Sequence, residues 1–317
     1  MAERGRWSVR ASLKVARSHP AAAAQGGRLY AIGGGGPGFR SLNSVEVYDP
    51  QTDRWTFARE MPTFRSGAMA LTLGEKIYVI GGGFKQPSGT FRFLKTVEIY
   101  DVRTDRWESG PDLLMPHDYP ALAYLHEKIY ILGGHHPGAT EGGPRTDPGF
   151  GFSERWSPGE PTWTEIAPVT VPRFALSAAV LKEELLAFGG VAFTPNGFHN
   201  FDFIERYDPA HNAWTQESDR RLPWPGAAIA SCVDQDRLYL FGGYSTDFIH
   251  ARGACLTPSS ERWETLAPMP VPRAAASAVP LGGRIYLAGG WAADGRTPME
   301  SVVAYEDSGD SIRRTGE

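Results

Sequence analysis

The side chains of this sequence best suited to proton transfer or metal binding are histidines with carboxylates nearby. Six histidines stand in segments between apolar runs: His19, His117, His135, His136, His199 and His250. The carboxylates in such segments are Asp118, Glu141, Asp147, Asp202 and Asp247. Imidazole and carboxylate groups bind metals and transfer protons near neutral pH. The chain lacks HxH, HxxxH and CxxC spacings, however, and two adjacent histidines would not easily both reach one ion. We therefore predict no metal and no other cofactor.

Basic and aromatic residues form a second group, in six segments that correspond to one another. These read VARSHPAA (15–22), PTFRSGA (62–68), PHDYPA (116–121), PRFALS (172–177), PWPGAA (223–228) and PRAAAS (272–277). They carry Arg17, Arg65, Arg173 and Arg273, together with His19, Tyr119, Phe174 and Trp224. Arginine forks match carboxylates and aromatic rings give rigid contact area, so the segments could bind an acidic ligand. Alternatively, the arginines pair with carboxylates of their own repeat.

Composition excludes several classes of protein. The 317 residues carry 32 Lys plus Arg against 36 Asp plus Glu, which is not the basic balance of a nucleic-acid-binding surface. A hydrophobic content of 41% is enough for a core, and two cysteines do not make a disulfide framework. No segment approaches the roughly 18–20 apolar residues of a membrane span, and the N-terminus does not resemble a signal peptide. We expect a monomeric cytoplasmic protein with neither nucleic acid nor membrane as a partner.

Two markers repeat along the chain with one period. Glycine pairs end apolar runs at Gly33-Gly34, Gly81-Gly82, Gly133-Gly134, Gly189-Gly190, Gly242-Gly243 and Gly289-Gly290. Tryptophans recur at Trp7, Trp55, Trp107, Trp163, Trp214 and Trp263. Each unit reads as four short strands; in the second these are 66–72, 76–82, 95–101 and 106–108. Their Ile, Tyr and Val residues favour strands, and no helical period persists, so the chain is predicted to be all-β.

The repeat resembles the kelch motif. Two stretches match it closely: RLYAIGG…SVEVYDPQTDRW (28–55) and KIYVIGG…TVEIYDVRTDRW (76–107). The resemblance covers Trp7 to about Tyr305 and implies a β-propeller. The third and fifth units depart from it, because Arg155-Trp156 and Cys255-Leu256 replace the Tyr-Asp of the third strand.

The count of units predicts six blades of four antiparallel strands. The sixth unit ends in a polar tail (306–317) without tryptophan, whereas Trp7 lies at the other end of the chain. The N-terminal strand should therefore complete the last blade and leave no exposed edge. We expect residues 1–317 to form one propeller domain.

The long loops point to the functional face. Connections between the second and third strands are long and unequal, and in a propeller they share one face, which we call the long-loop face. Trp291 and Tyr244 are expected there too. The predicted binding residues on this face are Arg17, His19, Arg65, His117, Tyr119, His135, Arg173, Phe174, His199, Trp224, Tyr244, His250, Arg273 and Trp291.

Two functions remain open. The first is a binding module that recognises a protein segment or a small-molecule ligand on the long-loop face. The resemblance supports it, because in kelch adaptors arginines at the start of the inner strands bind acidic motifs. The second is an enzyme of mutarotase, isomerase or lyase type, acting on a small polar or sugar-like substrate through the histidines and arginines of the same face. No catalytic motif favours the second.

Overall fold

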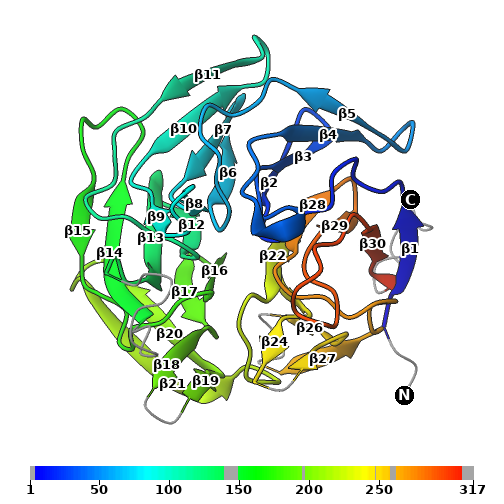
Figure 1. Ribbon diagram of the computed structural model, residues 1–317. Helices are drawn as coiled ribbons and strands as arrows, with labels where there is room; N and C mark the ends of the chain where they lie inside the picture. Colours follow the sequence, from blue (N-terminus) through cyan, green and yellow to red (C-terminus); the bar gives the residue numbers. More distant parts are fainter. Residues whose placement is uncertain (1–3, 139–148, 195–196, 247, 258–261, 309–317) are drawn as a thin grey trace, which may run out of the picture.

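The protein is built almost entirely from short antiparallel strands. The computed structural model describes residues 4–138, 149–194, 197–246, 248–257 and 262–308. Within these residues the one helical element is a single 3-10 turn, η1 (Pro37–Phe39). Six four-stranded sheets stand around a common axis, as predicted, and form the six blades of a propeller (Figure 1).

Each blade has the same strand order from the axis outward, and we number the blades from the first glycine pair. The inner strands are β2 (Ala21–Gln25), β6 (Met69–Leu73), β12 (Ala121–Leu125), β16 (Ser177–Leu181), β22 (Ala230–Asp234) and β28 (Ser277–Leu281). The second strands are β3 (Arg28–Ile32), β7 (Lys76–Ile80), β13 (Lys128–His135), β17 (Glu184–Phe188), β23 (Arg237–Phe241) and β29 (Arg284–Ala288). The third strands are β4 (Val45–Asp49), β10 (Val97–Asp101), β14 (Gly149–Trp156), β20 (Phe203–Asp208), β26 (Gly253–Leu256) and β30 (Val302–Glu306). The outer strands are β5 (Arg54–Ala58), β11 (Arg106–Ser109), β15 (Thr164–Ile166), β21 (Ala213–Arg221), β27 (Trp263–Leu266) and β1 (Arg6–Arg10).

The two ends of the described chain meet in blade 6. β1 pairs antiparallel with β30, with Trp7 opposite Tyr305, so the N-terminal strand is the outer strand of the last blade (Figure 1). This confirms the predicted closure. The first residues of the predicted polar tail are part of the blade: Glu306 ends β30, and Asp307 is paired with Arg4 and Arg237.

The periodic tryptophans connect neighbouring blades. Each indole Nε1–H donates a hydrogen bond of 2.7–3.1 Å to a backbone carbonyl in the segment before its own blade or in the preceding blade. Trp55, for example, donates to Ala11, and Trp7 donates to Ala267 beyond blade 5. A tyrosine of the third strand packs on the ring in several blades, as Tyr48 does on Trp55 at 5.1 Å. In blade 3 Trp156 takes this place beside Trp163, which explains the departure from the motif there.

The glycine pairs lie where the second strand of one blade passes the entry of the next. Gly33 and Gly34 both have positive φ, and the Gly34 amide donates to the Arg65 carbonyl at 2.8 Å. A Cβ at Gly33 would lie 2.7 Å from that same carbonyl oxygen, and one at Gly34 would lie 2.7 Å from the Ser18 carbonyl. Only glycine accepts both the backbone angle and the close approach.

None of the helical structure in the described residues is long and apolar enough to cross a membrane.

Candidate binding site at the channel mouth

Extra hairpins stand on the long-loop face. They are β8–β9 (Gly83–Lys85 and Phe91–Phe93), β18–β19 (Val191–Thr194 and Gly197–Asn200) and β24–β25 (Tyr244–Ser245 and Phe248–Ile249). All three connect the second and third strands of their blades, and Figure 1 shows them in front of the ring together with η1. The turns at the opposite ends of the strands are short. The long connections therefore lie on one face and the short turns on the other, as the loop lengths in the sequence predicted.

A ring of left-handed residues surrounds the channel where the inner strands begin. These residues, which we call the rim ring, are His19, Gly67, Tyr119, Ala175, Ala228 and Ala275, with φ between 45° and 66°. The amides of five of them each donate to the carbonyl of a rim-ring residue in an adjacent blade, over 2.8–3.1 Å. Gly67 shows why the small-residue run 66–72 was predicted too long as a strand: its φ of 66° breaks extended structure, and β6 begins at Met69. The bonds between rim-ring residues hold their side chains at the channel mouth.

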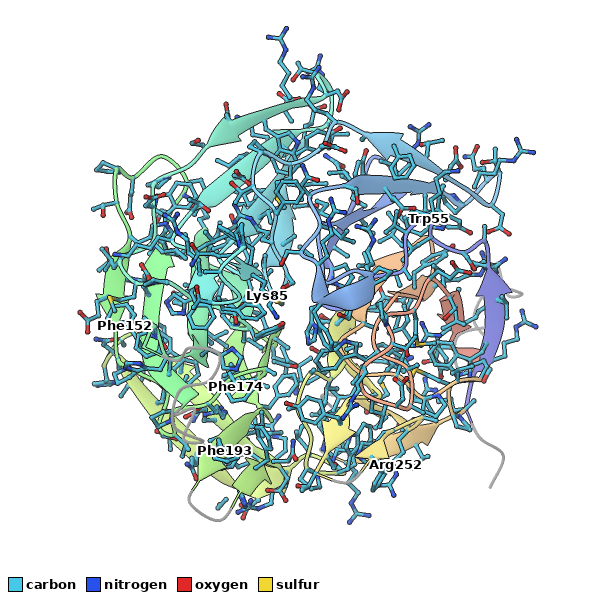
Figure 2. All side chains as sticks on the ribbon, in the orientation of Figure 1. Trp55, Lys85, Phe152, Phe174, Phe193 and Arg252 are labelled. Carbon is cyan, nitrogen blue, oxygen red and sulfur yellow. The ribbon has the colours of Figure 1, made fainter. Side chains whose placement is uncertain are left out.

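Five rings from four blades meet at this mouth. This mouth cluster consists of His19, Tyr119, His135, Phe174 and Trp291. The ring of His19 lies 4.5 Å from Tyr119 and 4.4 Å from Trp291, and His135 lies 5.2 Å from Tyr119 and 3.9 Å from Phe174. Figure 2 shows the labelled Phe174 nearer the axis than Phe193 or Trp55. The sequence predicted all five as binding residues, and the structure brings them together.

The two histidines of the mouth cluster have different surroundings. His135 Nδ1 donates to Asp118 Oδ2 over 2.8 Å, which orients its ring. His19 has a pKa lowered to about 3 by burial, with a further contribution from the nearby His135. Its Nδ1 is buried and has no hydrogen-bond partner among the described residues. Because His19 is neutral at physiological pH, its ring can donate one hydrogen bond and accept another.

The four arginines do not lie at the rim, and their predicted placement there is wrong. Arg17, Arg65, Arg173 and Arg273 are 0–1% exposed. Arg65 shows the usual arrangement: its guanidinium donates to the Gly81 and Thr96 carbonyls and forms a 2.7 Å ion pair with Glu98. Burial lowers the pKa of this guanidinium, and Glu98 opposes the shift. Inside a blade, such groups require partners because an unpaired buried charge is costly.

Arg17 and Arg173 follow the same arrangement, and Arg273 does not. The first two pair with Glu46 and Glu205. Arg273 donates to the carbonyls of Gly289 and Ser301 and to the Ser301 hydroxyl, and its Nε has no partner among the described residues. Burial lowers its pKa to about 10, so it remains charged at neutral pH.

His117 takes the place of the arginine in blade 3. It is fully buried, with Nδ1 2.6 Å from the Gly133 carbonyl and Nε2 3.2 Å from Glu154. Its predicted position on the open face is therefore also wrong.

Blade 5 has lost both members of the ion pair. Gly226 stands at the arginine position, and Ala254 stands at the position of the glutamate. Trp224 is 4% exposed and donates to the Gly242 carbonyl. His250 is 3% exposed, with Nε2 2.6 Å from Ser245 Oγ and its ring 5.9 Å from Trp224. These two predicted binding residues are packed inside the blade.

The remaining predicted residues are separated. Tyr244 is half-buried and packs beside Phe174 and Ala227, next to the mouth cluster. His199 is exposed on β19, and its ring meets Phe201 edge to face at 4.8 Å rather than any ring of the mouth cluster. Glu141, Asp147 and Asp247 lie outside the described residues. Within the described ranges there is no group of three or more His, Cys, Asp or Glu side chains that could hold a metal.

Comparisons with known proteins agree with the repeat. A model of the kelch motif matches residues 16–62 and 65–114. Kelch-like protein 23 of Homo sapiens is 28% identical over 278 residues, covering 88% of this chain and 46% of that protein. Beta-scruin of Limulus polyphemus is 25% identical over 199 residues, covering 61% of this chain and 21% of that protein. A solved structure titled "Structure of YjhT" superposes with a TM-score of 0.78 at 15% identity, covering 94% of this chain and 97% of that one.

The chain carries kelch motifs over residues 16–62 and 65–114, and its described residues fold as a six-bladed β-propeller. It spans less than half the length of Kelch-like protein 23, and the likeness to YjhT shows the fold alone.

The sequence did not single out the exposed phenylalanines of this propeller. Phe39 in η1, Phe64 before blade 2, Phe198 in β19 and Phe248 in β25 are 47–57% exposed. All four stand on the long-loop face, in the loops and hairpins around the mouth cluster. An apolar ring in a long loop was the available sign of them, because exposed apolar side chains that gather on one face are typical of interaction sites.

Proposed function

We propose that this kelch propeller binds a segment of a partner protein on its long-loop face, with the mouth cluster as the anchor. The observation that carries the proposal is the chain of ring contacts that joins five aromatic side chains from four blades at the channel mouth. Buried or half-buried aromatic groups surrounded by a rim of further contacts are typical of binding hot spots.

The surrounding charge supports an aromatic or apolar anchor residue rather than an acidic one. Three of the four arginines that could have attracted carboxylates are neutralised by glutamates inside the blades, and the fourth is buried. The exposed phenylalanines enlarge the apolar part of the face. We therefore expect the partner segment to present an aromatic or aliphatic side chain to Tyr119 and Trp291.

The test uses peptides selected from a random phage-displayed library on the immobilised protein. Their dissociation constants are then measured by fluorescence polarisation for the wild type and for Tyr119→Ala and Trp291→Ala. Alanine is compatible with the left-handed backbone at 119, because Ala175 and Ala228 occupy the same conformation in other blades. Each variant should weaken binding at least tenfold, as expected for loss of an anchor worth about 2 kcal/mol.

The matched control is Tyr124→Ala, which removes the same kind of side chain from the far end of β12, the inner strand that Tyr119 precedes. Peptide affinity should change less than twofold in this variant. If the selected peptides keep their affinity in Tyr119→Ala and Trp291→Ala, or lose it in Tyr124→Ala, the proposed face is wrong.

A further inference from the structure

The channel along the propeller axis is a cavity of its own below the mouth cluster. It encloses about 500 Å³ and is lined by all six inner strands, from the rim ring to Leu71, Tyr124, Val180 and Val233. Its size falls in the range of small-molecule pockets, roughly 300–1,000 Å³. The space exists because the half-buried positions midway along the strands are mostly small: Ala22, Ala70, Leu122, Ala178, Ser231 and Ala278.

The wall of this channel carries no ionic side chain. Charged residues make up 21% of the chain, yet none of the lining residues is Asp, Glu, Lys or Arg. The titratable groups among them are His19, Tyr119 and Tyr124. Burial lowers the pKa of His19 and raises the pKa of Tyr119, which keeps both side chains neutral at pH 7. A charged molecule would enter without a counter-charge, which is costly. The wall therefore selects for uncharged ligands.

The channel does offer hydrogen bonds. Each inner strand pairs on one edge only, with the second strand of its blade, so the other edge faces the axis with backbone N–H and C=O groups. At the rim end, the buried Nδ1 of His19 has no partner among the described residues. Buried polar atoms are nearly always hydrogen-bonded in proteins, so an unpaired polar atom in a pocket wall is available to hydrogen-bond a ligand.

The two ends of the channel differ in access. Ring contacts of His19 with Tyr119 and Trp291 narrow the end on the long-loop face. At the other end, which we call the short-turn mouth, Tyr124 is 40% exposed and Val180 and Val233 are half-buried. The apolar wall at this end leads to the unpaired nitrogen of His19 at the other end.

We propose that the channel is a binding site for a small uncharged ring compound, entered from the short-turn mouth, whose hydrogen-bonding group reaches His19. Its apolar body lies against the alanines and Leu122. This site shares His19 and Tyr119 with the mouth cluster, but its ligand class and its entrance differ from those of the peptide-binding face proposed above.

Three matched probes test the ligand class by fluorescence titration. 2-Naphthol is uncharged with one hydroxyl, naphthalene lacks the hydroxyl, and 2-naphthoate carries a charge. We expect 2-naphthol to saturate at one equivalent, with affinity about tenfold above naphthalene for the hydrogen bond and at least tenfold above 2-naphthoate for the uncompensated charge. Equal affinity of the three probes, or no saturation, overturns the proposal.

Two variants test the position. His19→Gly introduces the residue that blade 2 has at the same left-handed position, Gly67, so the backbone is not strained. It should lower 2-naphthol affinity about tenfold and abolish the preference over naphthalene. Tyr124→Ala at the short-turn mouth should lower 2-naphthol affinity severalfold, whereas exposed His211→Ala should leave it unchanged.

The same variants separate this proposal from the peptide-binding proposal. Tyr124→Ala should weaken 2-naphthol and spare the selected peptides. The channel is not the site if Tyr124→Ala leaves the affinity for 2-naphthol unchanged, or if His19→Gly retains the wild-type preference for 2-naphthol over naphthalene. This conclusion holds for any result of the peptide measurements.

Discussion

Buried arginines are the residues on which the blades of this propeller most depend for internal charge balance. Each of Arg17, Arg65 and Arg173 links the entry of its inner strand to the end of the second strand and to a glutamate of the third. A buried ion pair contributes little net stability, but removal of one partner leaves the other uncompensated. Arg273 lacks the glutamate because Val303 stands at that position of β30.

The difference between Arg65 and Arg273 predicts unequal effects of the same substitution. Arg65→Met leaves Glu98 buried without its cation and should lower the free energy of unfolding by about 3–5 kcal/mol. Arg273→Met strands no carboxylate and removes an unpaired buried charge, so its cost should stay below about 2 kcal/mol. Urea denaturation measures both, and the Arg65→Met/Glu98→Leu double variant should recover part of the first loss. Equal losses for the two single variants would show that the glutamate does not matter.

The sequence predicts residue types at the site better than side-chain directions. His19, Tyr119, His135, Phe174 and Trp291 could be placed at the mouth because rim positions follow from the repeat. The arginines could not, because each buried arginine stands only two positions before the rim-ring residue of its own blade, and the repeat does not tell which of the two faces the channel. The S-V-E segment of the third strand indicated the true placement of the arginine, since its glutamate is the partner of the buried guanidinium.

At the scale of the elements, the ring is held by hydrogen bonds between blades and by the pairing of β1 with β30. The tryptophan period predicted the blade count and the closure because each indole N–H makes the same kind of hydrogen bond toward the preceding blade. The hairpins β8–β9, β18–β19 and β24–β25 could not be predicted, because their sequences have no repeat and depend on contacts around the mouth.

Closure by the N-terminal strand predicts a large cost for Trp7→Ala. The Trp7 ring lies 5.2 Å from both Phe241 and Tyr305, and its Nε1 donates to Ala267. Loss of these contacts should lower stability by about 3–5 kcal/mol, measured by thermal or urea unfolding. Val9→Ala on the same strand is the control, because Val9 is 73% exposed and its truncation should cost less than about 0.5 kcal/mol. A Trp7→Ala protein that melts with the wild type would mean that β1 does not close the ring.

At the scale of the whole molecule, the two faces of the propeller differ in their loops and in their exposed side chains. The long-loop face carries the hairpins, the exposed phenylalanines and the mouth cluster, whereas the other face has short turns around the short-turn mouth. A rigid ring of blades holds the loops of different blades around one point. The arrangement supports recognition of a protein segment at the centre of the long-loop face.

The most direct measurement of this central claim uses the indole N–H resonances of the nine tryptophans. In ¹H–¹⁵N spectra of the protein with one equivalent of a selected peptide, the Trp291 resonance at the mouth should shift. The resonances of Trp107 and Trp263, whose N–H groups bond to backbone carbonyls between blades, should stay in place. Shifts of Trp107 or Trp263 with an unchanged Trp291 would contradict the proposed site.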